Sequence, residues 1–428
     1  TTKQITFDGE KNKIINGITD WVYEEEFAFV RAFEWNAGSD TIAFIRFDES
    51  QVPEFSMDIY GTDLYQTQEV FKYPKAGEKN AIVSLHFYDL NVDQTSTVAL
   101  SKNYQDFYIP RIKWTNDSTV LSAQYLNRHQ NTLDLWLINP KESKADLVLS
   151  EQDDAYVKVT DNLTFLDDRS FIWTSEKDGF NHIYHYTKEG KLKNQITKGD
   201  WEVTNYYGYN ESAHSIYYQS VENGSTNRDV YSIRLNGKKK KRLSLEEGTS
   251  DASFSADFTY FIKTYSNAST PPKYTLNDSK TGRLLKNIKD NSALLKTLSN
   301  YKFSNKEFST LNVNGNDLNM WMLKPADFEA AKTYPLLMFQ YSGPGSQKVA
   351  NSWFSSRDYW HQYLAQQGYI VACVDGRGTG FKGADFKKVT YLNLVKFETE
   401  DQIQAAKQIS KLPYIDASRI GIWGWSFG

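Results

Sequence analysis

The sequence predicts a β-propeller of four-stranded blades over residues 1–302, followed by an α/β domain over residues 303–428. Three observations support this prediction. Short apolar strands separated by turn residues recur up to about residue 300, at a spacing typical of propeller blades. Beyond residue 302, strand-like and helical segments alternate, which is typical of a parallel sheet covered by helices. Residues 424–428 form a glycine-rich turn directly after a predicted strand.

Composition places the chain among globular proteins. Its 428 residues are 40% hydrophobic and 24% charged, which excludes intrinsic disorder of the whole chain. The formal net charge is −4, and the one basic run, 238–242, follows a hairpin-turn signal, so nothing indicates nucleic-acid binding. No apolar run approaches the roughly 18 residues of a membrane span. The single cysteine, Cys373, excludes an intrachain disulfide and is expected to pack in a buried strand.

Five units of the first 300 residues share one shape, in which an aromatic or apolar residue leads into a polar turn and then a strand. The strands are predicted to start at residues 41, 119, 170, 215 and 258, so the spacings are 78, 51, 45 and 43 residues. The last three match the period of propeller blades. The long first spacing predicts an insertion between Ser50 and Lys79. We expect earlier blades upstream of residue 1; the alternative is a set of unrelated sandwich strands.

The α/β part is predicted from segments that follow one another in order. A strand at 336–341 follows a proline, a helix is expected near 353–367, and a buried strand follows at 369–374. The helix expected at 398–409 is acidic at its start and basic near its end, which complements the helix dipole. The strand at 419–423 then leads into the terminal turn.

The terminal turn reads Gly424-Trp425-Ser426-Phe427-Gly428, the G-x-S-x-G pattern of a nucleophile elbow. Small residues two before and two after the serine let the backbone close a strained strand-to-helix turn that exposes the hydroxyl. The alternative is an ordinary glycine-rich turn. A nucleophilic serine needs a base and an acid that orients the base, and in α/β-hydrolases these follow the serine as Asp and then His. The triad Asp and His are therefore expected beyond residue 428, and the six histidines of the chain are interpreted as structural or surface residues.

Acyl transfer also needs hydrogen-bond donors for the developing oxyanion. The backbone N–H of Phe427 is placed for this role by the geometry of an elbow. Tyr341, at the end of a predicted strand, is a candidate second donor because a phenol can donate to a developing alkoxide. The alternative for Tyr341 is a packed turn tyrosine.

An acidic cluster occurs near the start of the chain, in the stretch from Asp20 to Phe27. Its three consecutive glutamates repel one another, which costs little on a solvated helix capped by Asp20. In the alternative interpretation, a buried pair of these carboxylates grips a substrate ammonium through charge-assisted hydrogen bonds. The local sequence leaves both interpretations open.

Five motifs, in this order and spacing, resemble a known family. They are Asp20–Glu26 (D-W-V-Y-E-E-E), Tyr73–Gly77, Tyr341–Pro344, Asp375–Gly380 and Gly424–Gly428. Over essentially its whole length the chain resembles dipeptidyl peptidase IV of the prolyl oligopeptidase group of serine peptidases, in its bacterial, Bacteroidetes type. The first motif is the most specific of the five.

The resemblance implies an eight-bladed propeller that caps an α/β-hydrolase catalytic domain, which in this chain stops at the nucleophile elbow. It implies that Ser426 is the nucleophile, that Tyr341 and the Phe427 amide form the oxyanion hole, and that Glu25 and Glu26 bind the free N-terminal amine. The implied activity is release of X-Pro, and less readily X-Ala, dipeptides from peptides with a free N-terminus. The resemblance implies no metal and no cofactor.

It also implies a homodimer and an exported location, in the bacterial periplasm or cell envelope. The family arginine that helps the amine site is expected before residue 1, and Phe427 stands where many members have tyrosine. The 428 residues alone are expected to be inactive. Alternative functions are a prolyl tripeptidyl peptidase, an acylaminoacyl peptidase, or a non-catalytic propeller scaffold; the Glu25–Glu26 pair argues against acylated substrates and Ser426 against the scaffold.

Overall fold

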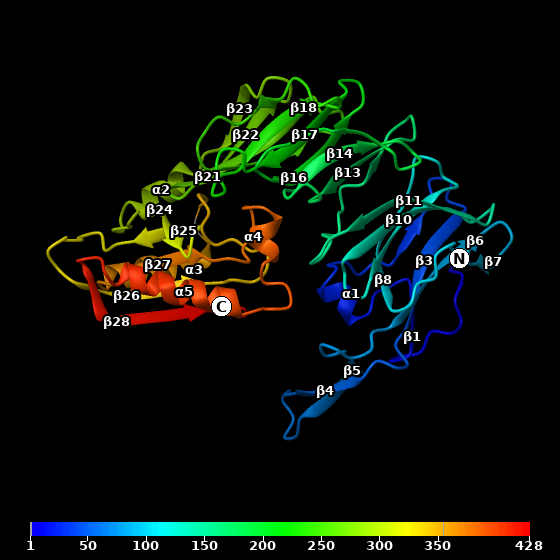
Figure 1. Cartoon of the computed structure of the whole chain (residues 1–428), viewed down its shortest axis with the longest axis horizontal. Helices are drawn as coiled ribbons and strands as arrows, with labels where there is room; N and C mark the ends of the chain where they lie inside the picture. Colours follow the sequence, from blue (N-terminus) through cyan, green and yellow to red (C-terminus); the bar gives the residue numbers. More distant parts are fainter. Residues whose placement is uncertain (1, 354) are drawn as a thin grey trace. The chain divides into compact units, whose positions relative to one another are not determined.

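The computed structural model describes residues 2–353 and 355–428 (Figure 1). The chain divides into two compact units. The first extends to Phe171 and includes residues 186–191, and the second comprises residues 172–185 and 192–428. Within the described residues, no helix is long and apolar enough to cross a membrane.

Two antiparallel sheets form most of the first unit, in the orders β1-β3-β6-β7 and β11-β10-β9-β8. Their strands are β1 (Ile14–Asn16), β3 (Thr41–Asp48), β6 (Ile82–Asp89), β7 (Gln94–Ser96), β8 (Phe107–Trp114), β9 (Leu121–Asn127), β10 (Thr132–Asn139) and β11 (Lys144–Gln152). The first sheet has a fifth strand, β2 (Phe33–Trp35), which pairs with β3. The prediction of four-stranded blades is therefore wrong for this sheet, because β2, the segment that leads into the turn before β3, also pairs with β3.

The insertion predicted between Ser50 and Lys79 is confirmed as a separate hairpin. It consists of β4 (Glu54–Ile59) and β5 (Thr67–Lys72), which pair only with each other. Every residue of β4 is solvent-exposed.

Three four-stranded antiparallel sheets follow along the chain. The first contains β12 (Thr164–Phe165), β13 (Phe171–Ser175), β14 (His182–Tyr186) and β15 (Leu192–Gln195), and the boundary between the units passes through it. The second contains β16 (Val203–Asn210), β17 (Ser215–Ser220), β18 (Asp229–Arg234) and β19 (Lys241–Arg242). The third contains β20 (Thr249–Phe254), β21 (Tyr260–Asn267), β22 (Thr270–Asp278) and β23 (Leu284–Lys289). Small antiparallel sheets of this kind are what a propeller-like N-terminal region requires.

A mixed sheet of order β24-β25-β27-β26-β28 forms the C-terminal part of the second unit, coloured yellow to red in Figure 1. Its strands are β24 (Lys306–Val313), β25 (Asn316–Leu323), β26 (Tyr334–Gln340), β27 (Ile370–Asp375) and β28 (Ile415–Gly424). The helices are α2 (Ser292–Leu298), α3 (Ser356–Gln366), α4 (Ala384–Lys388) and α5 (Lys396–Ile409). β26 runs parallel to β27 and β28, which confirms the predicted parallel arrangement, whereas β25 pairs antiparallel with β24 and β27.

Helices pack on both sides of β27, in the middle of this sheet, and successive side chains of the strand point to opposite faces. On β27, Ala372 packs in a core cluster with Ala405 of α5. The next residue, Cys373, packs in a second cluster with Ala365 of α3. Cys373 is fully buried, as predicted, and burial raises the pKa of its thiol well above the usual value. A thiol held protonated in this way is a structural rather than a reactive group.

Candidate active site

A strained turn at the end of β28 presents Ser426. The backbone of this serine has φ +59°, in the left-handed region that residues with a Cβ avoid. Its side chain is solvent-exposed. Strain of this kind persists only where the surroundings enforce it, and it is the conformation expected of a nucleophile elbow.

The two glycines of the motif enforce this turn by their close approach. A Cβ built on Gly424 would lie 2.3 Å from the carbonyl carbon of Gly428 and 2.7 Å from the carbonyl oxygen of Gln340. A Cβ on Gly428 would lie 2.4 Å from the amide nitrogen of Trp425. All of these are backbone atoms, which cannot rotate away. Only glycine fits at both positions, which is the physical reason for the spacing in the motif.

The loop that carries Tyr341 lies beside this elbow; we call residues 341–351 the Tyr341 loop. Gln340, the last residue of β26, is paired in register with Gly424, the last residue of β28. The next residues of both strands therefore emerge at the same edge of the sheet, where α/β proteins place their sites. The N–H of Ser342 donates to the Phe427 carbonyl oxygen over 3.4 Å. Gln340, Ser342, Phe427 and Ser426 also line one cavity of about 500 Å³.

The Tyr341 side chain is restricted from two sides. A Cβ on Gly343 would lie 3.0 Å from a ring carbon and 3.1 Å from the hydroxyl oxygen of Tyr341, so the glycine lets the ring lie against the backbone. The Lys348 ammonium lies 4.7 Å from the centre of the same ring, a cation–π distance. This role of Lys348 could not be predicted from the local sequence, because only the fold of the loop brings Lys348 to Tyr341.

Asp375 fixes the middle of the Tyr341 loop. Its carboxylate accepts hydrogen bonds from the N–H of Lys348, at 3.0 Å, and of Val349, at 2.8 Å. The residue is 4% exposed. Burial raises the pKa of Asp375 to about 6, and the backbone donors at Val349 and Lys348 oppose that shift.

The histidines with identified partners occupy structural positions. The two ring nitrogens of His182 are bonded to the Thr197 hydroxyl and the Gly199 carbonyl. His361 is 1% exposed in α3 and packs against the rings of Trp321 and Trp423. Both positions agree with the structural role predicted for these residues.

In the first unit, α1 (Trp21–Glu25) begins at the acidic cluster. Asp20 caps the helix, as predicted, because its carboxylate accepts from the Tyr23 N–H over 3.0 Å. Tyr23 is 2% exposed, and its hydroxyl oxygen accepts from the Ile109 N–H of β8 over 2.8 Å. Its ring also packs edge-on against Phe47 of β3. These contacts hold the short helix on two strands of the unit.

Glu25 and Glu26 end this helix with their side chains exposed. This exposure agrees with the interpretation of the cluster as a solvated helix and not with the alternative of a buried carboxylate pair, because the buried residues of the helix are Val22 and Tyr23. Within residues 2–353 and 355–428, neither carboxylate has an ion-pair partner, so both are available to an added cation.

Glu26 lines a cleft of about 960 Å³. The rings of Trp21 and Tyr73, 4.3 Å apart, form part of its wall. Arg128 also lines this cleft. Its guanidinium donates a hydrogen bond to the Glu78 carbonyl oxygen over 2.7 Å and forms an ion pair with Asp106 at 3.6 Å. The place of Arg128 in this cleft could not be predicted, because nothing in its local sequence distinguishes it from a turn residue.

Comparisons with known proteins show the family to which the chain belongs. The family model described as the dipeptidyl peptidase IV N-terminal region matches residues 1–272. The chain belongs to the dipeptidyl peptidase IV family. Residues 355–428 match the model of the prolyl oligopeptidase family, whose members are serine peptidases.

Curated relatives include probable dipeptidyl-aminopeptidases B from Phaeosphaeria nodorum and Pyrenophora teres f. teres, which are 32% and 33% identical over 99% of this chain. The chain spans 50% of the length of each of these relatives.

Solved structures in this family are similar over the whole chain. The dipeptidyl peptidase 4 of Porphyromonas gingivalis matches 100% of this chain and 60% of its own, with a TM-score of 0.95 and 44% identity. A putative dipeptidyl aminopeptidase IV of Bacteroides ovatus matches 99% of this chain and 62% of its own, with a TM-score of 0.88 and 26% identity.

Proposed function

We propose that this chain carries the nucleophile and the amine-binding residues of a serine exopeptidase that releases N-terminal X-Pro and, less readily, X-Ala dipeptides. Ser426 is the nucleophile, and Glu25 and Glu26 hold the free N-terminal amine of the peptide. The observation that carries the proposal is the strained backbone at Ser426 between two glycines that admit no Cβ. Membership of the dipeptidyl peptidase IV family supports the substrate class.

The chemistry proceeds through an acyl-enzyme. The triad base, which together with its orienting Asp lies beyond residue 428 in this proposal, takes the hydroxyl proton as the Ser426 oxygen attacks the scissile carbonyl carbon. The Tyr341 hydroxyl and the Phe427 N–H donate to the oxygen that gains the negative charge. Collapse of the intermediate breaks the C–N bond as the protonated triad base returns its proton to the leaving nitrogen, and the shortened peptide leaves with a free N-terminal amine. Water then hydrolyses the ester and releases the dipeptide.

An amine anchor gives such an enzyme its exopeptidase specificity. A receptor for the free amine binds the peptide by its first residue, so such an enzyme selects peptides whose scissile bond is two residues from that amine. The unpaired carboxylates of Glu25 and Glu26 and the aromatic cleft beside Glu26 support this role. Charge-assisted hydrogen bonds to an ammonium are short and strong, which offsets the partial desolvation of the two glutamates.

The domain assignment and the assembly belong to the same proposal. We assign residues 1–302 to the propeller domain and residues 303–428 to the first part of the hydrolase domain. The enzyme is proposed to be an exported homodimer that uses no cofactor.

The test uses the full-length protein with Gly-Pro-p-nitroanilide and a fluorophosphonate label. We expect wild type to hydrolyse the amide and to take up the label, and Ser426→Ala to lose both. Ser309→Ala, at an exposed position on β24, is the matched control and should keep both. A wild-type protein that neither hydrolyses nor labels would favour the non-catalytic scaffold, and release of tripeptides alone from longer peptides would favour a prolyl tripeptidyl peptidase.

A further inference from the structure

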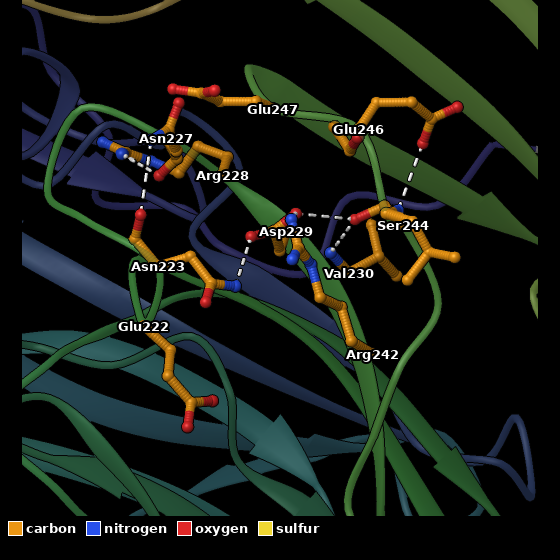
Figure 2. A network of polar contacts seen from close by, with 12 residues as sticks. Glu222, Asn223, Asn227, Arg228, Asp229, Val230, Arg242, Ser244, Glu246 and Glu247 are labelled. Atoms are coloured by element: carbon orange, nitrogen blue, oxygen red, sulfur yellow. Dashed lines mark hydrogen bonds and ion pairs between the residues drawn. The ribbon is translucent and has the colours of Figure 1, made fainter.

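The loop between β17 and β18 is held by hydrogen bonds within itself and to Asp229 at the start of β18. We call residues 222–228 the 222–228 loop. Its base is Asp229, which is 1% exposed (Figure 2). The Asp229 carboxylate accepts from Arg242 at 2.8 Å, from Ser244 at 3.0 Å and from Asn223 at 2.8 Å. A buried carboxylate with three donors holds the strand end and the start of the loop in one arrangement.

Arg228, in the last position of this loop, is held by the loop itself. Its guanidinium donates to the carbonyl oxygens of Ser225, at 2.9 Å, and Asn227, at 2.8 Å. The remaining arm of the guanidinium points out of the loop and donates to the side-chain oxygen of Gln347 over 2.6 Å. Its plane also lies 4.0 Å from the ring centre of Phe381. The Gln347 amide nitrogen donates back to the Ser225 carbonyl over 2.8 Å, so the contact is reciprocal.

Gln347 belongs to the Tyr341 loop, and a second residue of that loop, Asn351, is held in the same way. The Asn351 N–H donates to the Thr226 carbonyl over 2.8 Å, and its side chain donates to the Asn227 side chain over 3.1 Å. Four hydrogen bonds therefore join the 222–228 loop to the Tyr341 loop. They bracket the segment that contains Lys348.

Lys348 is also fixed from the side of the mixed sheet. Its N–H donates to Asp375 over 3.0 Å, and its carbonyl accepts from the Trp321 indole over 3.1 Å. Its backbone is therefore held on both sides, and its ammonium lies 4.7 Å from the ring centre of Tyr341. The contacts run without a gap from Arg228 through Gln347 and Lys348 to Tyr341.

We propose that Arg228 is a positioning residue, which holds the Tyr341 loop through Gln347 so that the Tyr341 hydroxyl stays aimed at the oxyanion. The inference rests on the proposed function, in which Tyr341 is an oxyanion donor. Under this proposal the propeller-like sheets would position an oxyanion donor through Arg228, in addition to binding the amine through Glu25 and Glu26. A donor displaced by about 1 Å loses most of its effect on the transition state, whereas substrate affinity is left nearly unchanged.

The test is a double-mutant cycle in the full-length protein with Gly-Pro-p-nitroanilide. We expect Arg228→Met to lower kcat about 10- to 100-fold with KM within about twofold, because only transition-state contacts are lost. Gln347→Ala removes the partner and leaves Arg228 intact, and it should lower kcat by a similar factor. Arg234→Met is the matched control, because Arg234 lies on β18 and donates to Ala213, away from the Tyr341 loop; its kcat should equal wild type.

The decisive readout is the effect of each change in a Tyr341→Phe background. If Arg228 acts through Tyr341, Arg228→Met should slow Tyr341→Phe by less than about twofold. The inference is overturned if Arg228→Met and Gln347→Ala leave kcat unchanged, or if they lower it by the same factor in both backgrounds, as a general loosening of the fold would. If Tyr341→Phe itself leaves kcat unchanged while Ser426→Ala abolishes activity, the oxyanion role of Tyr341 fails and the inference falls with it.

Discussion

Replacement of Gly424 by alanine tests the elbow most simply, because it adds one methyl group. That methyl would lie 2.3 Å from the Gly428 carbonyl carbon, 2.4 Å from the Gly428 Cα and 2.7 Å from the Gln340 oxygen. Optimal contacts between carbon atoms lie at about 3.5–4.0 Å, so the new atom intrudes by about 1 Å on three backbone atoms. The turn at Ser426 must open to make room.

The size of the effect follows from that displacement. Overpacking typically costs about 1–3 kcal/mol of stability, and the upper end applies here because no flexible side chain can move aside. A shift of about 1 Å at a reacting group lowers the rate about 100-fold. We therefore expect Gly424→Ala to reduce kcat by at least about 100-fold in the full-length protein, with a smaller change in KM.

The assay is steady-state hydrolysis of Gly-Pro-p-nitroanilide, with a thermal melt to confirm that each variant is folded. Gly421→Ala is the matched control on the same strand, because its Cβ would meet only the far end of the Leu337 side chain, at 3.3 Å. We expect this control to keep kcat within about threefold of wild type, since a flexible side chain can adjust. A folded Gly424→Ala variant with wild-type kcat would refute the steric account of the elbow.

Two further predictions concern charge. Glu25→Gln and Glu26→Gln should each raise KM about 10- to 100-fold, because each removes one hydrogen bond between charged groups. Glu24→Gln is the control and should leave KM unchanged. Equal effects of all three changes would mean that only the net charge of the cluster matters. Burial raises the pKa of Asp375 to about 6. Between about pH 4 and pH 6 the Asp375 carboxyl is therefore protonated in the folded state and ionised in the unfolded state. Stability should therefore fall as pH rises through that window, by on the order of 3 kcal/mol, and then level off. Denaturant unfolding as a function of pH should show this dependence in wild type and not in Asp375→Asn; an unchanged profile in the variant would assign it to another group.

The order of elements was predictable where a segment's own periodicity determines its structure. The predicted bounds of β26, β27, α3 and α5 lie within a few residues of the observed ones, because runs such as 369–374 are apolar and are bounded by a glycine and an aspartate. The hairpin of β24 and β25 was missed, although Asn314-Gly315 at its turn is a strong hairpin signal. Its first strand is largely exposed and shows no apolar run.

The candidate site divides in the same way. The turn at Ser426 could be predicted because its steric requirement is local: Gly424 and Gly428 are needed where a Cβ would collide with backbone atoms. Contacts such as Lys348 over Tyr341 or Arg228 on Gln347 join residues that the fold brings together, and no local pattern records them. The local sequence leaves the exposure of Glu25 and Glu26 open, since a five-residue helix has too few residues to show which face is buried.

The central claim is that one protein combines a serine nucleophile with a receptor for a free amine. The most direct measurement compares kcat/KM for Gly-Pro-p-nitroanilide with that for its N-acetylated twin, using the full-length wild-type protein. The account predicts that the free-amine substrate is hydrolysed and that the acetylated one, which lacks an ammonium for Glu25 and Glu26, is not detectably hydrolysed. Equal hydrolysis of both would contradict the amine receptor and favour an endopeptidase or an acylaminoacyl peptidase.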